Sequence, residues 1–486
     1  MTLSTSVPAS LKKPDSFHTF QHVKAGGALV ALPLRVLLIG AKSAAGTAVV
    51  ETPVQVFDLA DGIVKAGQGS ELALMIAKAF EQGNLNGSSG RGGMPELWIC
   101  PQAAPAGNAA AQTLTVTGPA TASGTGHVRI AGRDVFFGVT SGDAQNTIAA
   151  ALEAAIDALV RELPVTAGVA ANVVTCTHVT AGTNGNDVAY EVVSVPAGVA
   201  IASAQSVAGT GTLDITLAVD AAVDKNYDAV AISIHSAAAV TDALAHVAAM
   251  WGFAQKFWRW LFIGDKATLA TAQGYATSAN SEKILVVSYE GSPSLPSEIA
   301  TACAVAGFGV ERPNANYDGV EVALYPPAKS LVYTSSEIES ALAGGVTPLI
   351  PTSSGSSTQI VRLVTTKTTD GGAPFFALLD LAFSRTLAFR ATQYDVQYKA
   401  RFKQEVIDGD LDDPEATLLP RVRDMCVEID RTMGDLKYLR DVEDLVPQIR
   451  VEEASSPAGR LLVQAPCRVA GPLHQTAFDH LHYYLS

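Results

Sequence analysis

The feature that most limits the possible folds of this chain is a repeated alternation of apolar runs with helical patterns. Apolar runs of strand length occur at residues 34–39, 96–100, 228–234, 257–263 and 284–287. Between them, apolar residues recur at helical spacing, as at Val240, Leu244 and Val247. Strands that alternate with helices of about ten to fifteen residues indicate βαβ units and a mainly parallel sheet. We therefore expect an α/β body.

Residues 108–222 interrupt this alternation. They contain short β-branched runs at 113–117, 128–130, 134–137 and 172–176, separated by glycines, and one amphipathic helix through Ile148 and Leu152. This pattern predicts a β-rich domain inserted between two strands of the α/β body. Such an insertion is tolerated when the chain leaves and re-enters the host domain at nearby points.

The C-terminal part has a different pattern. Thr334 and Glu337 form a capping-box sequence, and the helix that they open is expected to stop at Gly344-Gly345. Further helices are predicted at 375–404 and 418–433, and strands at 359–366, 448–451 and 461–469.

The predicted fold class is α/β and multidomain: a mainly parallel α/β body, an inserted β-rich domain, and an α+β C-terminal domain with extended terminal arms. The expected divisions are an N-terminal arm at 1–24, the discontinuous α/β domain at 25–107 and 223–330, the insert at 108–222, a C-terminal α+β assembly domain at 331–460, and a C-terminal arm at 461–486.

Composition narrows the classes of partner. The net charge is −14 over 486 residues, and an acidic surface repels both nucleic acid and anionic lipid. Residues 1–17 lack the apolar core of a signal peptide, and the longest apolar run, 28–39, is too short to span a bilayer. We expect a protein made in the cytoplasm. Only 16% of the residues are charged, which suits surfaces that end against other subunits but also fits an ordinary alanine-rich soluble protein.

No motif carries a complete set of catalytic or ligand-binding residues. Residues 40–46 follow a strand but lack the glycine directly before Lys-Ser that a phosphate loop requires. Asp408, Asp410 and Asp412 imitate a calcium loop that lacks its turn glycine and its final glutamate. His474, His480 and His482 have no matching carboxylate or thiol nearby. We therefore expect no catalytic, cofactor-binding or metal site.

Five scattered cysteines follow no metal-ligand spacing; they are Cys100, Cys176, Cys303, Cys426 and Cys467. Buried free thiols are the expected state, and disulfides between subunits are the alternative.

Three groups of residues together suggest a family. The first is the segment 7–14 (VPASLKKP), and the second is the Gly-x-Gly-Ser-x-Leu pattern in 67–72 with Glu96-Leu-Trp98 after it. The third combines Arg312-Pro313, the capping box, and the segments 344–349 and 467–475. In this order along nearly the whole chain, they resemble the tail sheath proteins of Mu-like contractile-tailed phages. The insert, at 113–118, 130–132 and 163–167, is similar to the insertion of the same family.

The resemblance implies a structural subunit of a contractile tail sheath and not an enzyme. Such subunits polymerise as stacked six-fold rings around an inner tube, and contraction drives the tube through the host cell envelope. The implied partners are further copies of the chain, the tail tube protein, and the baseplate and tail terminator proteins, with no direct nucleic acid contact, no membrane insertion and no cofactor. The protein would be made in the bacterial host cytoplasm and reside in the virion tail.

The resemblance also suggests which residues make contacts. The N-terminal arm would anchor in a neighbouring subunit through Leu11, Phe17 and Phe20, and the C-terminal strand region would pair with such an arm through Val463, Val469 and Leu473. Candidates for facing the tube are Arg421, Arg423 and Arg431. In the alternative, these arginines only balance Asp424, Glu428 and Asp430 on an exposed helix.

Two other classes of protein stay open from the residues alone. One is an enzyme on a Rossmann-like sheet, supported only by the α/β pattern. It would require a convergent polar pocket at the carboxyl ends of the strands. The other is a binding or adhesin module built on the β-rich insert.

Overall fold

A computed structural model describes residues 29, 33–233, 236–252, 255–355, 357–402, 418–454 and 460–472. By their contacts the residues divide into two compact units. The larger unit is Leu32–Ala388 with Gly471–Ser486, and the smaller unit is Met1–Ala31 with Phe389–Ala470.

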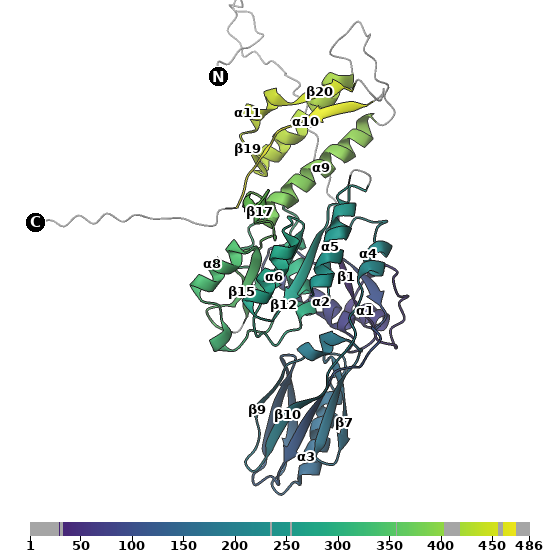
Figure 1. Ribbon diagram of the computed structural model, residues 1–486, viewed down its shortest axis with the longest axis vertical. Helices are drawn as coiled ribbons and strands as arrows, with labels where there is room; N and C mark the ends of the chain where they lie inside the picture. The colour runs from purple at the N-terminus through teal and green to yellow at the C-terminus, as the bar shows by residue number, and fades with distance from the viewer. Residues whose placement is uncertain are drawn as a thin grey trace, which may run out of the picture. The chain divides into compact units, whose positions relative to one another are not determined.

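A nine-stranded sheet forms the centre of the larger unit (Figure 1). Its strand order is β14-β16-β15-β13-β12-β11-β1-β3-β2, and the run from β3 to β15 is parallel. The strands are β1 (Arg35–Ala41), β2 (Val54–Val56), β3 (Glu96–Gln102), β11 (Ala229–Ile232), β12 (Trp260–Asp265), β13 (Ile284–Ser288), β14 (Glu321–Val322), β15 (Val346–Pro351) and β16 (Thr358–Ile360).

Helices cover both faces of this sheet, as the apolar runs predict for strands that are buried on both sides. In β1, Val36 and Leu38 belong to one hydrophobic core together with α2 and α7, and Leu37 and Ile39 belong to a second core together with α4, α5 and α6. The helices of this unit are α1 (Leu59–Ala66), α2 (Glu71–Ser88), α4 (Thr216–Ala221), α5 (Ala237–Met250), α6 (Leu269–Ala279), α7 (Pro296–Phe308) and α8 (Ser335–Ala343).

The capping box is confirmed at the start of α8. The Thr334 hydroxyl accepts from the Glu337 backbone N–H, and the Thr334 N–H donates to the Glu337 carboxylate at 2.8 Å. The helix ends at Ala343, directly before Gly344.

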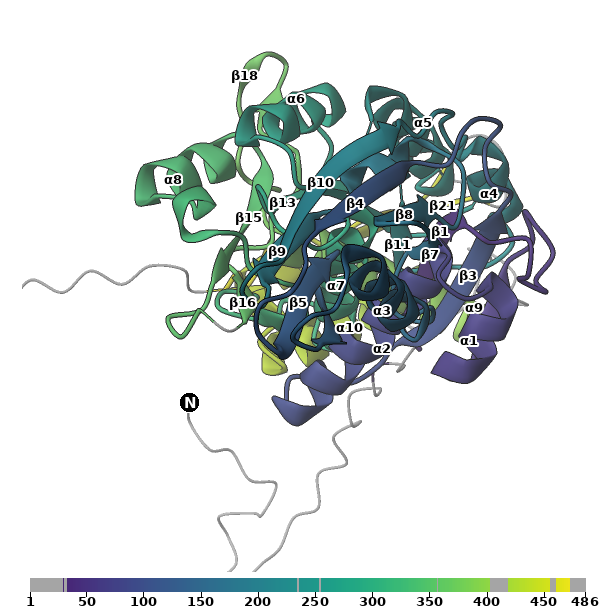
Figure 2. The same ribbon diagram turned by 90° about the horizontal axis from the view of Figure 1, so that it is seen from below.

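The insert, whose ribbon is labelled in Figure 2, has side chains that form a hydrophobic core of their own. Two antiparallel sheets, β10-β4-β8-β7 and β6-β5-β9, enclose this core with helix α3. The elements are β4 (Ala111–Thr117), β5 (Gly124–Ile130), β6 (Arg133–Val139), α3 (Gln145–Asp157), β7 (Val165–Ala170), β8 (Val173–His178), the 3₁₀ helix η1 (Thr183–Asp187), β9 (Tyr190–Ser194) and β10 (Ala200–Val207). A β-rich segment between β3 and β11 is therefore confirmed.

The two segments of the chain that connect the insert to the body lie side by side. The Asn108 N–H donates to the Thr210 hydroxyl at 2.9 Å, and the Thr210 N–H donates to the Asn108 carbonyl at 3.0 Å. We call this pair of segments, 106–108 and 209–211, the neck. The insert in the structure is thus 107–211, shorter than the predicted 108–222, because Ile215, Ala218 and Val219 lie in the core of the body.

The predicted division at 330 also differs from the structure. β15 pairs in parallel with β13, and β16 returns antiparallel to β15, so residues 346–360 extend the sheet of the body. The strand predicted at 359–366 ends at Ile360.

Two predicted strand ends were also wrong. β3 continues through Pro101 to Gln102. β12 continues through Gly264, where a Cβ atom would lie 2.0 Å from the Pro296 carbonyl at the start of α7.

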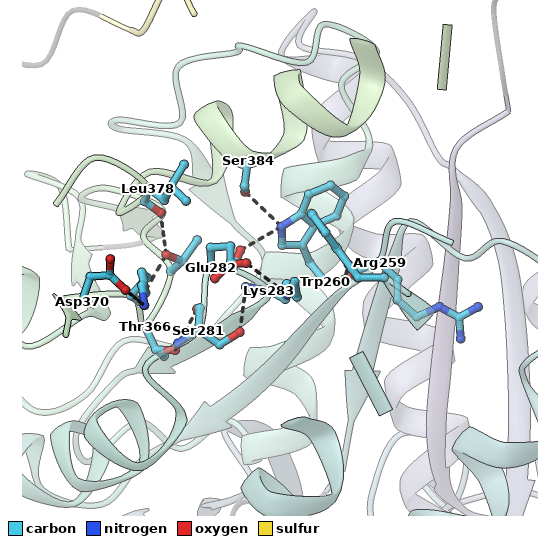
Figure 3. Close-up of polar contacts among 12 residues, drawn as sticks. Arg259, Trp260, Ser281, Glu282, Lys283, Thr366, Asp370, Leu378 and Ser384 are labelled. Atoms are coloured by element: carbon cyan, nitrogen blue, oxygen red, sulfur yellow. Dashed lines mark hydrogen bonds and ion pairs between the residues drawn. The ribbon is translucent and has the colours of Figure 1, made fainter. Parts of the chain in front are cut away.

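The long helix α9 (Leu381–Phe402) begins against the sheet of the body. Figure 3 shows the Trp260 indole donating to the Ser384 hydroxyl and to the Glu282 carbonyl, both at 3.1 Å. Nearby, the Thr366 hydroxyl bonds both the N–H and the carbonyl of Ser281. A short hairpin of β17 (Thr369–Asp370) and β18 (Ala373–Pro374) precedes α9.

The smaller unit contains the C-terminal part of α9 and two short sheets. Its remaining elements are α10 (Leu418–Asp435), β19 (Leu439–Arg440), α11 (Val442–Leu445), β20 (Arg450–Glu453), β21 (Leu461–Gln464) and β22 (Arg468–Val469). β19 pairs with β22, and β20 pairs with β21, both antiparallel. Leu29 packs against the hydrophobic core that α10 supplies. The two predicted helices and the late strand region are confirmed, although the last strand is divided into β21 and β22.

Candidate functional site

The carboxyl ends of the parallel strands are where open α/β sheets bind their ligands, at the point where the strand order reverses. Here that point lies between β1 and β11, since β3 and β11 flank β1 on opposite sides. The insert lies against it. The Asn184 side-chain amide donates to both Glu71 carboxylate oxygens, at 3.0 and 2.9 Å, and to the Ser233 carbonyl at 2.9 Å. The Glu71 carboxylate and the Ser233 carbonyl, which lie where a ligand would bind, are hydrogen-bonded to the insert instead.

Glu71 occupies the first turn of α2, where the helix dipole favours a negative charge. Only 3% of the residue is exposed. Burial raises the pKa of its carboxyl to about 7, although the hydrogen bonds from Asn184 oppose this shift. A carboxylate of the chain itself therefore fills the position that a phosphate would take in a nucleotide-binding protein.

The loop at residues 40–46 closes on itself. The Lys42 ammonium donates to the Gly46 carbonyl at 2.8 Å, and the Ser43 N–H donates to the Ala66 carbonyl at 3.0 Å. Gly67 lies so close that a Cβ atom there would be 2.0 Å from the Ser43 hydroxyl. The polar groups named here therefore bond within the body.

Within the described ranges, no group of three or more His, Cys, Asp and Glu side chains is arranged to hold a metal ion. The residues of the two incomplete metal-site patterns lie outside the described residues; they are Asp408, Asp410, Asp412, His474, His480 and His482. All five cysteines are free thiols, with Cys467 half-buried and the others buried. Burial raises the pKa of the Cys100 thiol to about 12 and that of Cys426 to about 11.

The smaller unit is held together by a buried ion pair between its two helices. Arg390 of α9 donates through Nε and Nη2 to the two carboxylate oxygens of Asp430 in α10, each at 2.7 Å. The Arg390 Nη1 also donates to the Ala465 carbonyl at 3.0 Å, and the Tyr394 hydroxyl donates to Asp430 at 2.9 Å. Arg390 is 9% exposed and Asp430 is 3% exposed. We call these four residues the clamp.

The clamp fixes the segment that follows β21. Ala465 lies one residue after β21 ends at Gln464 and three residues before β22 begins at Arg468. Its carbonyl is bonded to a guanidinium that is itself held by a bidentate carboxylate, the strongest form of side-chain pairing. Burial raises the pKa of the Tyr394 hydroxyl far above its usual range, despite the nearby Arg390 charge, so this hydroxyl keeps its proton.

The predicted strand-pairing residues fall on these short sheets where the structure describes them. Val463 lies in β21 and is 44% exposed, next to Leu462 at 45%. Val469 lies in β22, opposite Leu439, and is partly buried in the core of the unit. Leu11, Phe17, Phe20 and Leu473 lie outside the described residues.

The three predicted tube-facing arginines lie on α10 but have different surroundings. Arg431 is exposed and pairs with Glu443 through two bonds of 2.7 and 2.9 Å. Arg423 is half-buried and donates to the Ile449 carbonyl at 3.2 Å. Arg421 is exposed and lies over the Phe402 ring. Of the acidic residues that the alternative assigns to these arginines, Asp430 pairs with Arg390 and Glu428 pairs with Arg401.

Arg431 also lines a surface hollow of about 460 Å³ in the smaller unit. Its charged lining mixes both signs and comprises Arg431, Lys437, Arg440, Asp435, Asp441 and Glu443. The hollow therefore has no single sign of charge that would select an anionic or a cationic partner.

Sequence reasoning missed the clamp and Asn184. No local pattern singles out Arg390 within its helix, and its partner lies 40 positions away. The available signal was a charged residue at an inward position of an amphipathic helix, because Asp430 follows Cys426 and Val427 on the apolar face of α10. Asn184 lies in a Thr-Asn-Gly-Asn-Asp run of residue types typical of turns, for which no element was predicted.

In the part of the chain that the structure describes, we find no helix both long and apolar enough to cross a membrane. No family model matches the chain. It is 33% identical over 184 residues to the Mu-like prophage FluMu tail sheath protein of Haemophilus influenzae. The match spans 38% of this chain and 36% of that protein, about a third of the relative's length.

Two solved structures share the fold. The sheath tail protein of Desulfitobacterium hafniense superposes with a TM-score of 0.51 at 14% identity, over 94% of this chain and 97% of that one. The sheath tail protein of Listeria innocua does so with a TM-score of 0.53 at 12% identity, over 91% and 93% of the two chains. The resemblance to Mu-like tail sheath proteins is thus confirmed by homology, and the fold is that of the two sheath tail proteins.

Proposed function

From its homology to a Mu-like prophage tail sheath protein, we propose that this chain is the structural subunit of a contractile tail sheath. It polymerises as stacked six-fold rings around an inner tube, and contraction drives the tube through the envelope of the host cell. Its partners are further copies of the chain, the tail tube protein, and the baseplate and tail terminator proteins. The assembled protein resides in the virion tail, after synthesis in the bacterial host cytoplasm.

The observation that best supports assembly through strand exchange is the β20–β21 hairpin. It is a two-stranded sheet, so each strand has one edge without a partner among the described residues. Leu462 and Val463 are exposed on β21, although natural proteins usually protect an apolar edge. We propose that an extended arm of a neighbouring subunit adds a strand here, with Leu11, Phe17 and Phe20 on the N-terminal arm and Val463, Val469 and Leu473 on the receiving side.

The clamp supports the same proposal. A strand added from another subunit pulls on the hairpin during assembly and contraction. The Arg390–Asp430 pair ties the chain just after β21 to both long helices of the unit. We propose that Arg421, Arg423 and Arg431 of α10 face the tube.

Electron microscopy of the purified full-length chain tests this function. We expect helical tubes or stacked rings. Val463→Asp should prevent their formation, because it places a charge in the strand-pairing edge, and it should leave the melting temperature of the subunit unchanged. The matched control is Val193→Asp, an equally exposed valine on β9 of the insert (40% against 44%), which should assemble normally.

Failure of the wild-type chain to form any ordered polymer, alone or with a tube protein, would contradict the sheath function. Normal tubes from Val463→Asp would contradict only the strand-pairing surface.

A further inference from the structure

The insert is joined to the body by polar contacts and not by a shared core. Within the described residues, the hydrophobic cluster of the insert contains only members from 114–201, and the two clusters of the body contain none from 107–211. Among the described residues, the contacts across the joint are hydrogen bonds, the Arg133–Glu298 ion pair, and the approach of Gly132 and Arg133 to the Tyr325 ring. Polar interfaces between domains of one chain resemble transient ones and allow relative motion.

The neck is built as a pivot. Only two segments cross it, and they pack so closely that a Cβ atom on Gly107 would lie 2.0 Å from the Thr210 carbonyl. A Cβ atom on Gly211 would lie 2.2 Å from the Ala106 carbonyl. Both glycines have positive φ, +150° and +90°, so the backbone here adopts conformations that other residues rarely reach. The segments form a narrow stalk without bulky side chains at these two positions.

Polar contacts at three places, among the described residues, hold the insert on the body beyond the neck. The Asn184 side-chain amide donates hydrogen bonds to the Glu71 carboxylate and to the Ser233 carbonyl. The Lys266 ammonium donates to the Asp187 carbonyl at 2.8 Å. Arg133 pairs with Glu298, which is fully buried.

The turn before α2 lets the insert come close. At Gly69, a Cβ atom would lie 2.9 Å from the Leu163 carbonyl of the insert. The Gly-x-Gly-Ser-x-Leu pattern, 67–72, therefore combines a glycine that admits the insert, a serine that caps α2 by accepting from the Ala73 N–H, and the Glu71 that the insert binds.

We propose that the insert is a hinged module that pivots at the neck and is held closed by a latch between Glu71 of the body and Asn184 of the insert. The amide of Asn184 satisfies the carboxylate by hydrogen bonding but carries no charge to neutralise it. The closed joint therefore carries a buried charge whose release into water favours opening. This hinge is a property of the free chain and does not depend on sheath assembly.

The pH dependence of the latch follows from the charged groups around it. In the closed state, burial raises the pKa of Glu71 to about 7, and the nearby Asp187 raises it further. When the insert swings away and water reaches the carboxyl, the pKa returns towards its ordinary 4.5. The closed state thus binds the proton more tightly. Closing is most favourable below pH 4.5 and loses favour as the pH rises through 7, so the opening constant grows on the order of 100-fold.

The other ionisable contacts do not share this response. Burial alone would raise the pKa of Glu298, but the facing Arg133 and Lys78 charges outweigh it and lower the pKa. Glu298 therefore stays ionised between pH 4.5 and 7. Lys266 has its pKa lowered by burial, against the attraction of Asp187 and Glu298.

Distances between two spin labels test the hinge directly. Labels are placed at Thr125→Cys on the insert and Thr277→Cys on α6 of the body, both exposed, in a full chain carrying Cys467→Ser. Double electron–electron resonance should give one narrow distance at pH 5 and an added, broad population at pH 8. Glu71→Gln, which cannot ionise, should give the narrow distance at both pH values.

Substitutions of Asn184 provide the opposite test. Asn184→Ala should give the broad population at both pH values, and Asn184→Asp should do so at pH 8 while regaining the narrow distance at pH 5. The matched control is Asn172→Ala, since the Asn172 amide donates within the insert to the Val116 carbonyl and should leave the wild-type pattern unchanged. A single narrow distance for wild type and Asn184→Ala at both pH values, in chains with native circular dichroism, would overturn the hinge. An unchanged pH response in Glu71→Gln would overturn the latch.

Discussion

The insert and the smaller C-terminal unit both combine short strands with helices, but their sheets differ in size. The insert closes two antiparallel sheets over a core that includes Leu114, Ile148 and Leu152, all fully buried. In its described residues, the C-terminal unit has two sheets of two strands each, a size that is marginal in isolation. It compensates with a polar clamp between its helices. The difference separates a domain that is finished by folding from one whose sheets have room for strands from outside.

Breaking the clamp should have the largest effect. Asp430→Ala leaves the Arg390 guanidinium buried without its carboxylate, and removal of one partner of a buried pair typically costs about 3–5 kcal/mol. We expect the C-terminal unit to lose its protection against hydrogen exchange while the sheet of the larger unit keeps its own. The control is Arg401→Ala, whose pair with Glu428 is partly exposed, and a comparable loss there would contradict the special role of the clamp.

A cavity in the insert should have a somewhat smaller and more local effect. Leu152→Ala removes a fully buried side chain of α3 from the hydrophobic core of the insert. Such a substitution typically lowers the free energy of unfolding by about 2–5 kcal/mol. Chemical denaturation followed by hydrogen exchange should show the strands β4–β10 opening early and β1, β11 and β12 unchanged. If the whole chain unfolded in one transition, the insert would not be an independent folding unit.

The smallest effect is expected from exposed ion pairs in the two regions. Glu443→Gln removes the partner of Arg431 on α10, and Asp134→Asn removes the partner of Arg129 on the insert. Neither should shift the unfolding midpoint measurably, because water and salt screen exposed pairs. If Glu443→Gln alone changed tube formation, the surface around Arg431 would be identified as an assembly contact.

The sheet of the body was predictable because its strands are fully buried apolar runs separated by helices. β15 was not predicted because prolines are rare in strands. Pro348 nevertheless lies within this strand, and Pro351 is its last residue. β7 and β10 were missed because small residues replace the β-branched pattern, as in the Ala-Ile-Ala-Ser-Ala start of β10. These strands form because their neighbours β4 and β8 offer free edges, which is tertiary information.

The contacts that matter for the proposals were less predictable than the elements. Val463 could be placed on a strand from its apolar run, but its exposure depends on β20 being its one partner strand among the described residues. Asn184 and Glu71 are 113 positions apart, and no local pattern connects a loop residue to the first turn of a distant helix. The buried charge at this joint follows from the fold alone.

The neck has a consequence for how proteins of this kind diversify. Since both ends of the insert meet at the Asn108–Thr210 pair, a short turn there would rejoin the chain without moving a strand of the main sheet. The insert is in this sense an exchangeable cassette: it can be lost, replaced or enlarged while the scaffold beneath it stays whole. The same geometry marks residues 108–210 as the place to graft a foreign domain onto this chain.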